Sequence, residues 1–262
     1  MSQQTQVERV VGFYRAWLRR FPTLRSVALA DKRDILRLWS GLGYNNRALR
    51  LQRLAQQVAN GPTRALPRSP EELEKLPGIG KYTAHAIACF AFGAAVPLAD
   101  VNIRRVLSRV SLRVKSRTEM RTEKEVWQIA ESILPRSGAA EWNQALMELG
   151  ARVCTARTPK CGECPIHTAC RSAFSRTLLE EGPMKNGSEP TFKGVPRRIY
   201  RGKILKALHS RRLTSHQLAR ALIRDFRLRD LGWFHDILRR MHKDELIVLR
   251  KDGKGLQVQI AQ

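Results

Sequence analysis

Four cysteines gathered in one short stretch constrain this chain more than any other feature of its sequence. Their spacing is Cys154-x6-Cys161-x2-Cys164-x5-Cys170, and the fifth cysteine, Cys89, lies far upstream in an apolar run. Thiolates at such spacings hold either a zinc ion or a four-iron cluster, and the spacing alone leaves both open. Cys89 is expected to be a buried core thiol.

The charge balance points to a polyanionic partner. The 262 residues include 48 Lys plus Arg against 23 Asp plus Glu, which gives a formal net charge of +25. Nucleic acid is the first candidate, and a basic membrane-surface protein is the rival. The chain has no apolar run of about 18 residues, and its first residues lack the order of a secretory signal. We therefore expect a cytoplasmic, DNA-associated protein in a reducing compartment, with metal-binding cysteines rather than disulfides.

Apolar residues recur at helical spacing along most of the chain. Such stripes cover residues 7–18, 35–39, 48–58 and 126–133, and Ser69-Pro70-Glu71-Glu72 is a typical helix start with a capping serine. No convincing alternating strand precedes residue 240. The sequence therefore predicts a mainly α fold for its larger part.

The C-terminal part differs in composition. Residues 175–195 contain Gly182-Pro183 and Asn186-Gly187 and are predicted to be a linker. Residues 196–262 show three helical patterns and then two short strands around Asp252-Gly253, which predicts a small winged-helix-like α+β unit. Its arginines and lysines either bind DNA phosphates or form a solvated surface: Arg197, Arg198, Arg201, Lys203, Arg211, Arg212, Arg239 and Arg240.

A glycine pair marks a turn between two helical segments at Leu76-Pro77-Gly78-Ile79-Gly80-Lys81-Tyr82-Thr83-Ala84. Glycines permit positive φ and close backbone approach, so the amides that begin the next helix can face a phosphate oxygen. A plain interhelical turn explains the pair equally well. Asp100, which precedes the next amphipathic stripe, is by itself most simply a helix N-cap.

The flanking residues resemble a known family, the helix-hairpin-helix DNA glycosylases that include endonuclease III and the MutY-type adenine glycosylases. The resemblance covers residues 1 to about 174, and QQTQV and GLGY favour the MutY branch. It is carried by LPGIGKYTAHAIACFAFG, by Asp100-Val101-Asn102-Ile103-Arg104-Arg105-Val106, by Gln3-Gln4-Thr5-Gln6-Val7, by Leu38-Trp39-Ser40-Gly41-Leu42-Gly43-Tyr44 and by the cysteine spacing.

The resemblance implies a glycosylase domain over residues 1–174 with a [4Fe-4S] cluster on the loop 154–170. It implies that Asp100 is the catalytic carboxylate, that Asn102 supports it, and that Tyr82 occupies the place of the lysine of strand-cleaving relatives. A tyrosine forms no Schiff base, so hydrolysis without strand cleavage is expected. The implied DNA contacts are Gln3, Gln4 and Tyr44 as wedge residues, and Gly78, Gly80, Lys81 and Thr83 at the hairpin.

The expected function is excision of adenine opposite G or 8-oxoguanine by a monomer acting on double-stranded DNA. A thymine mismatch glycosylase and an endonuclease III-like enzyme are the alternatives. The alternative from another functional class is a DNA-binding iron-sulfur protein that catalyses no reaction.

The sequence departs from the family at both ends. The family's general-acid glutamate lies just ahead of the Gln-Gln motif, so we expect it upstream of Met1 or else missing, and we predict severely impaired excision for residues 1–262 alone. In place of the usual C-terminal domain that reads 8-oxoguanine, we expect the basic winged-helix-like unit.

Overall fold

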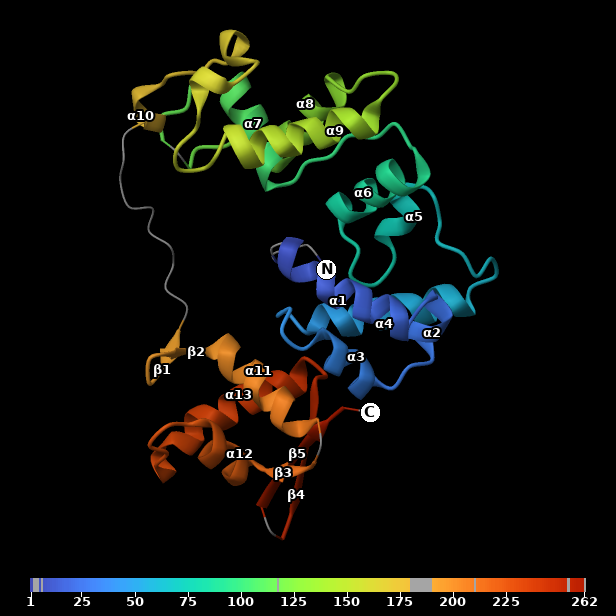
Figure 1. Ribbon diagram of the computed structural model, residues 1–262, viewed down its shortest axis with the longest axis vertical. Coiled ribbons are helices and arrows are strands. Elements are labelled where there is room, and N and C mark those ends of the chain that lie inside the picture. Colours follow the sequence, from blue (N-terminus) through green and yellow to red (C-terminus); the bar gives the residue numbers. More distant parts are fainter. Residues whose placement is uncertain are drawn as a thin grey trace. The chain divides into compact units, whose positions relative to one another are not determined.

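The computed structural model describes residues 1, 5, 7–116, 118–179, 190–209, 211–253 and 255–261. Contacts group the chain into two compact units, Met1–Leu66 with Gly187–Gln262, and Pro67–Asn186. Helices dominate both (Figure 1). None of the helices in the described ranges is long and apolar enough to cross a membrane.

The first unit begins with four helices. They are α1 (Val7–Arg20), α2 (Leu24–Ala28), α3 (Lys32–Trp39) and α4 (Asn46–Asn60). Their apolar stripes meet in a core where Trp17 makes edge contacts with Phe21 and Trp39, at centroid distances of 5.0 and 5.6 Å. The helical spacing read from the sequence is confirmed here.

The C-terminal part of this unit contains three helices and a small sheet. The helices are α11 (Arg197–Leu208), α12 (Ser215–Leu222) and α13 (Leu231–Lys243), with a 3-10 turn η4 (Leu228–Asp230). The strands β3 (Leu213–Thr214), β4 (Ile247–Asp252) and β5 (Gly255–Ile260) form an antiparallel sheet of order β3-β5-β4. Three helices and a hairpin agree with the winged-helix-like expectation.

Three two-residue strands precede residue 240, where the sequence showed none. Besides β3 they are β1 (Thr191–Phe192) and β2 (Val195–Pro196), which pair with each other inside the stretch predicted to be a linker. Two residues are too short to show alternation, so the pattern could not find them. The linker's glycine-rich residues 180–189 lie outside the described residues.

The C-terminal helices share a core with the N-terminal ones. Leu36 of α3 and Leu49 of α4 belong to the same buried cluster as Tyr200, Phe234 and Ile237. An ion pair between Arg53 and Glu245 joins the same two segments. This grouping follows contacts rather than sequence order, and the domain boundaries at residues 174 and 196 stay a prediction.

The second unit carries the hairpin and the cysteine loop. Its α-helices are α5 (Pro70–Glu74), α6 (Lys81–Phe92), α7 (Val101–Ser111), α8 (Glu123–Ser132), α9 (Ala139–Glu148) and α10 (Arg176–Leu179); a π-helical turn η1 (Leu149–Val153) and two 3-10 turns, η2 (Cys161–Glu163) and η3 (His167–Ala169), complete it. Ser69 caps α5 as predicted, by accepting a hydrogen bond from the Glu72 amide. The core lies between α7, α8 and α9, around Leu98, Ile103 and Val106.

Candidate active site and iron-sulfur loop

The glycine turn joins α5 to α6 as a hairpin. Gly78 has a φ of +81°, which favours glycine, whereas Gly80 is extended at φ −103°, so the positive φ expected for both holds for Gly78 alone. Gly80 is the N-cap of α6 and has no side chain to cap it. The first amides of α6 therefore start at an uncapped, positively polarised helix end, which suits an anion.

The segment that leads from α6 to Asp100 is held by buried polar groups. Asn143 on α9 accepts a hydrogen bond from the Leu98 amide at 3.1 Å and donates one to the Val96 carbonyl at 2.9 Å. His85 on α6 lies 3.0 Å from the Pro97 carbonyl. Because Asn143 is 1% exposed, both contacts are shielded from water, and the backbone ahead of Asp100 is fixed.

Asp100 is the N-cap of α7 and uses its two carboxylate oxygens differently. Oδ1 accepts the Ile103 amide at 2.7 Å, which closes the cap, and Oδ2 accepts the side-chain amide of Asn102 at 3.1 Å. The side chain is partly buried. The structural role and a catalytic one are therefore compatible, since the cap orients the carboxylate and the helix end favours its negative charge.

Tyr82 lies within the electrostatic reach of Asp100. Burial raises the pKa of the Tyr82 phenol, and the Asp100 carboxylate raises this pKa further. The phenol oxygen is 3.9 Å from the Met147 sulfur. Tyr82 is thus a neutral, partly buried phenol beside a carboxylate, in a position where it supplies no nucleophilic amine.

Asn102 is oriented by a buried arginine that the sequence analysis did not single out. Arg105, 6% exposed, donates to Asn102 Oδ1 at 2.8 Å, to the Gly150 carbonyl at 2.6 Å and to the Cys154 carbonyl at 2.7 Å. Because Oδ1 accepts from Arg105, the amide nitrogen of Asn102 is the group that faces Asp100. A continuous chain of hydrogen bonds therefore links Asp100 to the first cysteine of the loop.

Gly150 permits this arrangement. A Cβ at Gly150 would lie 2.8 Å from Cβ of Asn102, closer than real side chains come. The glycine sits in the π-helical turn η1, which brings its carbonyl to Arg105. The sequence shows Gly150 four residues before Cys154, but no local pattern in it pairs this glycine with Arg105.

The four cysteines of the loop line one common cavity. Arg109, 2% exposed, lines it as well and donates to the Cys154 sulfur at 3.4 Å and to the Thr155 carbonyl at 2.7 Å. Burial raises the pKa of the Cys170 thiol, and the other three cysteines raise this pKa further. The four sulfurs are thus mutually close in one partly buried site.

Four thiols on one cavity are a ligand set that suits a [4Fe-4S] cluster as well as a zinc ion. Cys154, Cys161, Cys164 and Cys170 are the residues that would hold either group.

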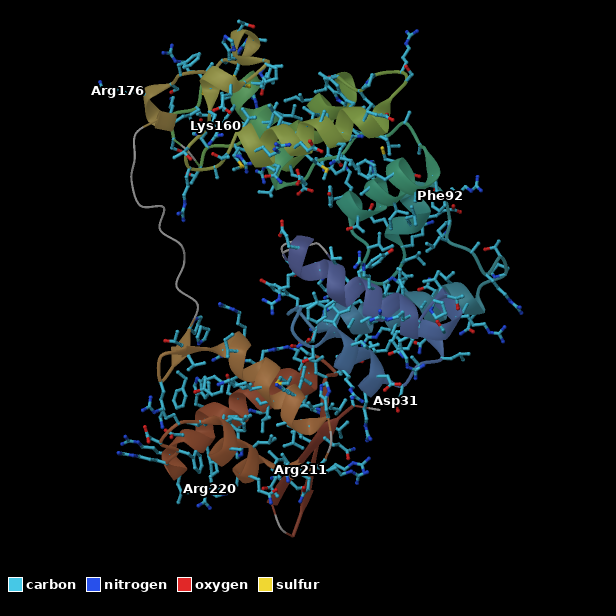
Figure 2. All side chains as sticks on the ribbon, viewed as in Figure 1. Asp31, Phe92, Lys160, Arg176, Arg211 and Arg220 are labelled. Atoms are coloured by element: carbon cyan, nitrogen blue, oxygen red, sulfur yellow. The ribbon has the colours of Figure 1, made fainter. Side chains whose placement is uncertain are left out.

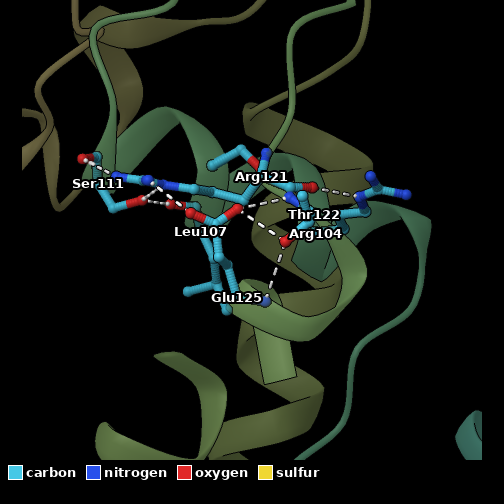
Figure 3. A network of polar contacts seen from close by, with 7 residues as sticks. Arg104, Leu107, Ser111, Arg121, Thr122 and Glu125 are labelled. Atoms are coloured by element: carbon cyan, nitrogen blue, oxygen red, sulfur yellow. Dashed lines mark hydrogen bonds and ion pairs between the residues drawn. The ribbon is translucent and has the colours of Figure 1, made fainter. Parts of the chain in front are cut away.

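A second network holds the loop between α7 and α8 (Figure 3). The Arg121 side chain donates to the Ser111 carbonyl at 3.2 Å and pairs with Glu125 at 2.9 Å, and the Arg121 carbonyl accepts from Arg104 at 2.9 Å. The Arg121 amide donates to Ser108, which is fully buried. These contacts tie α7 to the segment that leads into α8.

The remaining predicted site residues are distributed over both units. Lys81 is exposed with its ammonium 4.3 Å from the Trp127 ring, and Thr83 is partly buried in the first turn of α6. Tyr44 belongs to the other unit, is 62% exposed and has a φ of +47°. Gln3 and Gln4 lie outside the described residues.

Comparison with known proteins agrees with this geometry. The family model of the HhH-GPD superfamily of base excision DNA repair proteins matches residues 1–132, and that of the iron-sulfur binding domain of endonuclease III matches residues 154–170. The fold also resembles a solved thermostable thymine-DNA glycosylase, with a TM-score of 0.59 and 28% identity over 67% of this chain and 79% of that one. Hairpin, capped aspartate and cysteine loop therefore define a helix-hairpin-helix glycosylase with a [4Fe-4S] cluster.

Similar curated proteins indicate which branch of the helix-hairpin-helix glycosylases this chain belongs to. The adenine DNA glycosylase of Mycobacterium tuberculosis is 37% identical over 97% of this chain and 81% of its own length, and that of Mycolicibacterium smegmatis is 43% identical over 79% and 69%. The human adenine DNA glycosylase is 40% identical over 66% of this chain, which spans 32% of the human protein. This chain belongs to the adenine DNA glycosylase family.

Proposed function

We propose that this protein hydrolyses the N-glycosidic bond of adenine mispaired with G or 8-oxoguanine in double-stranded DNA and leaves the strand intact. One observation carries the proposal: the Asp100 carboxylate is fixed at the start of α7, with Asn102 on its second oxygen. The target base, adenine, is inferred from the family to which the chain belongs.

The chemistry follows from the charge that develops on the sugar. As the bond to adenine breaks, C1′ gains positive charge, and a carboxylate held beside it lowers the barrier by electrostatic stabilisation or covalent capture. Asn102 and the Ile103 amide hold Asp100 in place before the reaction, so little reorganisation is needed. Protonation of the leaving adenine needs a second acid, which in the family is the glutamate ahead of Gln3 and Gln4.

The absence of a lyase step is proposed from Tyr82 and Lys81. Tyr82 stays a neutral phenol, and the Lys81 ammonium lies over the Trp127 ring, so the two neighbouring side chains point to different surroundings. One helical step rotates a side chain by about 100°. Neither residue places an amine beside Asp100.

The proposed DNA contacts lie in the motifs that carry the family resemblance. Gly78, Gly80, Lys81 and Thr83 form the phosphate-binding hairpin at the uncapped start of α6. Exposed Tyr44 serves with Gln3 and Gln4 as the wedge that fills the gap left by the flipped base. The [4Fe-4S] cluster, held by Cys154, Cys161, Cys164 and Cys170, supplies a rigid support for α7. The protein acts as a cytoplasmic monomer.

The test is incubation of the purified protein with three duplexes, holding A opposite 8-oxoguanine, T opposite G, or thymine glycol. We expect strand breaks with the first duplex alone, and only after alkali. Release is followed for hours with protein in excess, so that slow release is detected as well. Thymine release, or breaks without alkali, would contradict the proposal.

A further inference from the structure

The basic residues of the C-terminal part fall into two groups once their partners are known. Arg197 and Arg240 both pair with Asp236, at 3.5 and 2.9 Å, and Arg201 pairs with Asp244 at 2.5 Å. Each of these three arginines therefore has a carboxylate partner in the same segment, and two of them share Asp236. Their binding of DNA phosphates, with a solvated surface as the alternative, stays a prediction.

The second group lies on the last turn of α12 and on the segment that leads from there to α13. We call residues 220–230 the basic turn; its four arginines are all exposed: Arg220, Arg224, Arg227 and Arg229. Figure 2 labels Arg220 at the surface of α12. Arg224 is 94% exposed and its carboxylate neighbour Asp225 is 85% exposed at 3.8 Å, a separation at which water weakens the pair.

Lys193 holds the backbone of the basic turn through three hydrogen bonds. Its ammonium donates to the carbonyls of Arg224 and Asp225, at 3.1 and 2.7 Å, and to the Asp230 carboxylate at 2.7 Å. Asp230 is 6% exposed and also accepts the Arg227 amide at 2.8 Å. Asp230, the second acid of the turn, is therefore already bound by Lys193 and by the Arg227 amide, and the backbone that carries the arginines is fixed.

An aromatic contact and an exposed leucine complete the turn. Phe226 meets the ring of His216 on α12 at a centroid distance of 5.3 Å, which ties the turn back to the helix. Leu228 lies between Arg227 and Arg229 with 71% of its surface exposed. An apolar side chain between two exposed arginines suits a DNA groove, where it meets sugars and base edges while the arginines meet phosphates.

We propose that the basic turn is a second DNA-binding surface that holds the phosphate backbone of duplex DNA, separate from the glycosylase site. Four exposed arginines stand against one exposed carboxylate, that of Asp225. Because Lys193 fixes the turn beforehand, little conformational freedom is lost on binding. The proposal does not depend on adenine excision, since any duplex presents the same phosphates.

The experiment measures how the affinity of the full chain for an undamaged duplex depends on salt. Each phosphate contact contributes about 0.9 to the slope of log affinity against log salt. The variant Arg227→Ala with Arg229→Ala is expected to lower this slope by about 1.8. The matched control removes two exposed arginines of α1 in the same unit, Arg15→Ala with Arg19→Ala, and is expected to keep the wild-type slope.

A second pair, Arg227→Gln with Arg229→Gln, keeps side-chain length and is expected to lose the same slope. Melting temperatures of all variants should match that of the wild type because the changed side chains are exposed. A wild-type slope in both changed turns, or an equal loss in the α1 control, would overturn the proposal. Because the duplex holds no mismatch, failure of the glycosylase proposal leaves this result unaffected.

Discussion

Asp100 serves two roles because its two oxygens face different groups. One oxygen caps α7 through Ile103, and the other is held by Asn102. The sequence pattern predicts that Asp100 caps the helix, and the family resemblance implies its catalytic role. Neither shows that a single rotamer of Asp100 satisfies both roles. Substitutions that separate the two oxygens therefore separate the roles.

Asp100→Asn should retain the cap, because asparagine is as good an N-cap as aspartate. The melting temperature is expected to stay near that of the wild type, while single-turnover adenine release falls by at least about 100-fold. Asp100→Ala should lose release equally and, in addition, about 1 kcal/mol of stability. Equal melting temperatures for all three proteins would mean that the cap contributes little.

Tyr82 predicts a loss of stability at high pH. Its pKa lies above 10 in the folded protein, because of burial and then of the Asp100 charge, whereas the unfolded chain titrates near 10. The folded state thus keeps a proton that the unfolded state releases. The contribution of the Tyr82 phenol to folding stability is therefore complete below about pH 10 and is lost as the pH rises through the folded pKa.

Melting temperatures between about pH 8 and 11 test this. Tyr82→Phe should reduce the fall in melting temperature between these two pH values. Tyr14→Phe, which changes an exposed tyrosine of α1, should leave the profile as it is. The same decline in both variants would show that Tyr82 does not cause it.

At the scale of elements, α7 is the structural centre of the second unit. Its N-terminus holds Asp100, and Arg105 and Arg109, one turn apart, fasten the start of the cysteine loop. Helix periodicity predicts α7 as an amphipathic helix and would assign both arginines to solvent. Their burial depends on carbonyls brought close by the π-helical turn η1, which no local pattern announces.

Arg105→Met should loosen the loop. The change leaves the Gly150 and Cys154 carbonyls and Asn102 Oδ1 without their donor, and each buried acceptor costs about 1–3 kcal/mol. We expect a stability loss of at least about 2 kcal/mol and a lower iron content per chain. The control is Arg104→Met on the same helix, because the Arg104 side chain makes one described hydrogen bond, to the Arg121 carbonyl. Equal iron content in both variants would contradict the role assigned to Arg105.

At the scale of the whole molecule, the sequence indicates the fold class and most of the site, because both rest on local features. Helical stripes, caps and cysteine spacing involve residues close in the chain. The grouping of α3 and α4 with the C-terminal helices, through Leu36 and Leu49, joins residues more than 150 apart and leaves no local signal. The pairing of Arg197 with Asp236 and of Arg201 with Asp244 also joins residues far apart in the chain, whereas Arg240 and Asp236 lie four residues apart on α13, a spacing that the sequence does show.

The central claim is that Asp100 stabilises positive charge on the sugar of a flipped nucleotide. Its most direct test compares the affinity for two duplexes that differ only in the sugar opposite 8-oxoguanine: a cationic pyrrolidine and a neutral tetrahydrofuran. This test needs no general acid. The wild-type chain should prefer the cationic duplex by at least about tenfold, or about 1.4 kcal/mol, and Asp100→Asn should bind both alike. An equal preference in the two proteins would contradict the account.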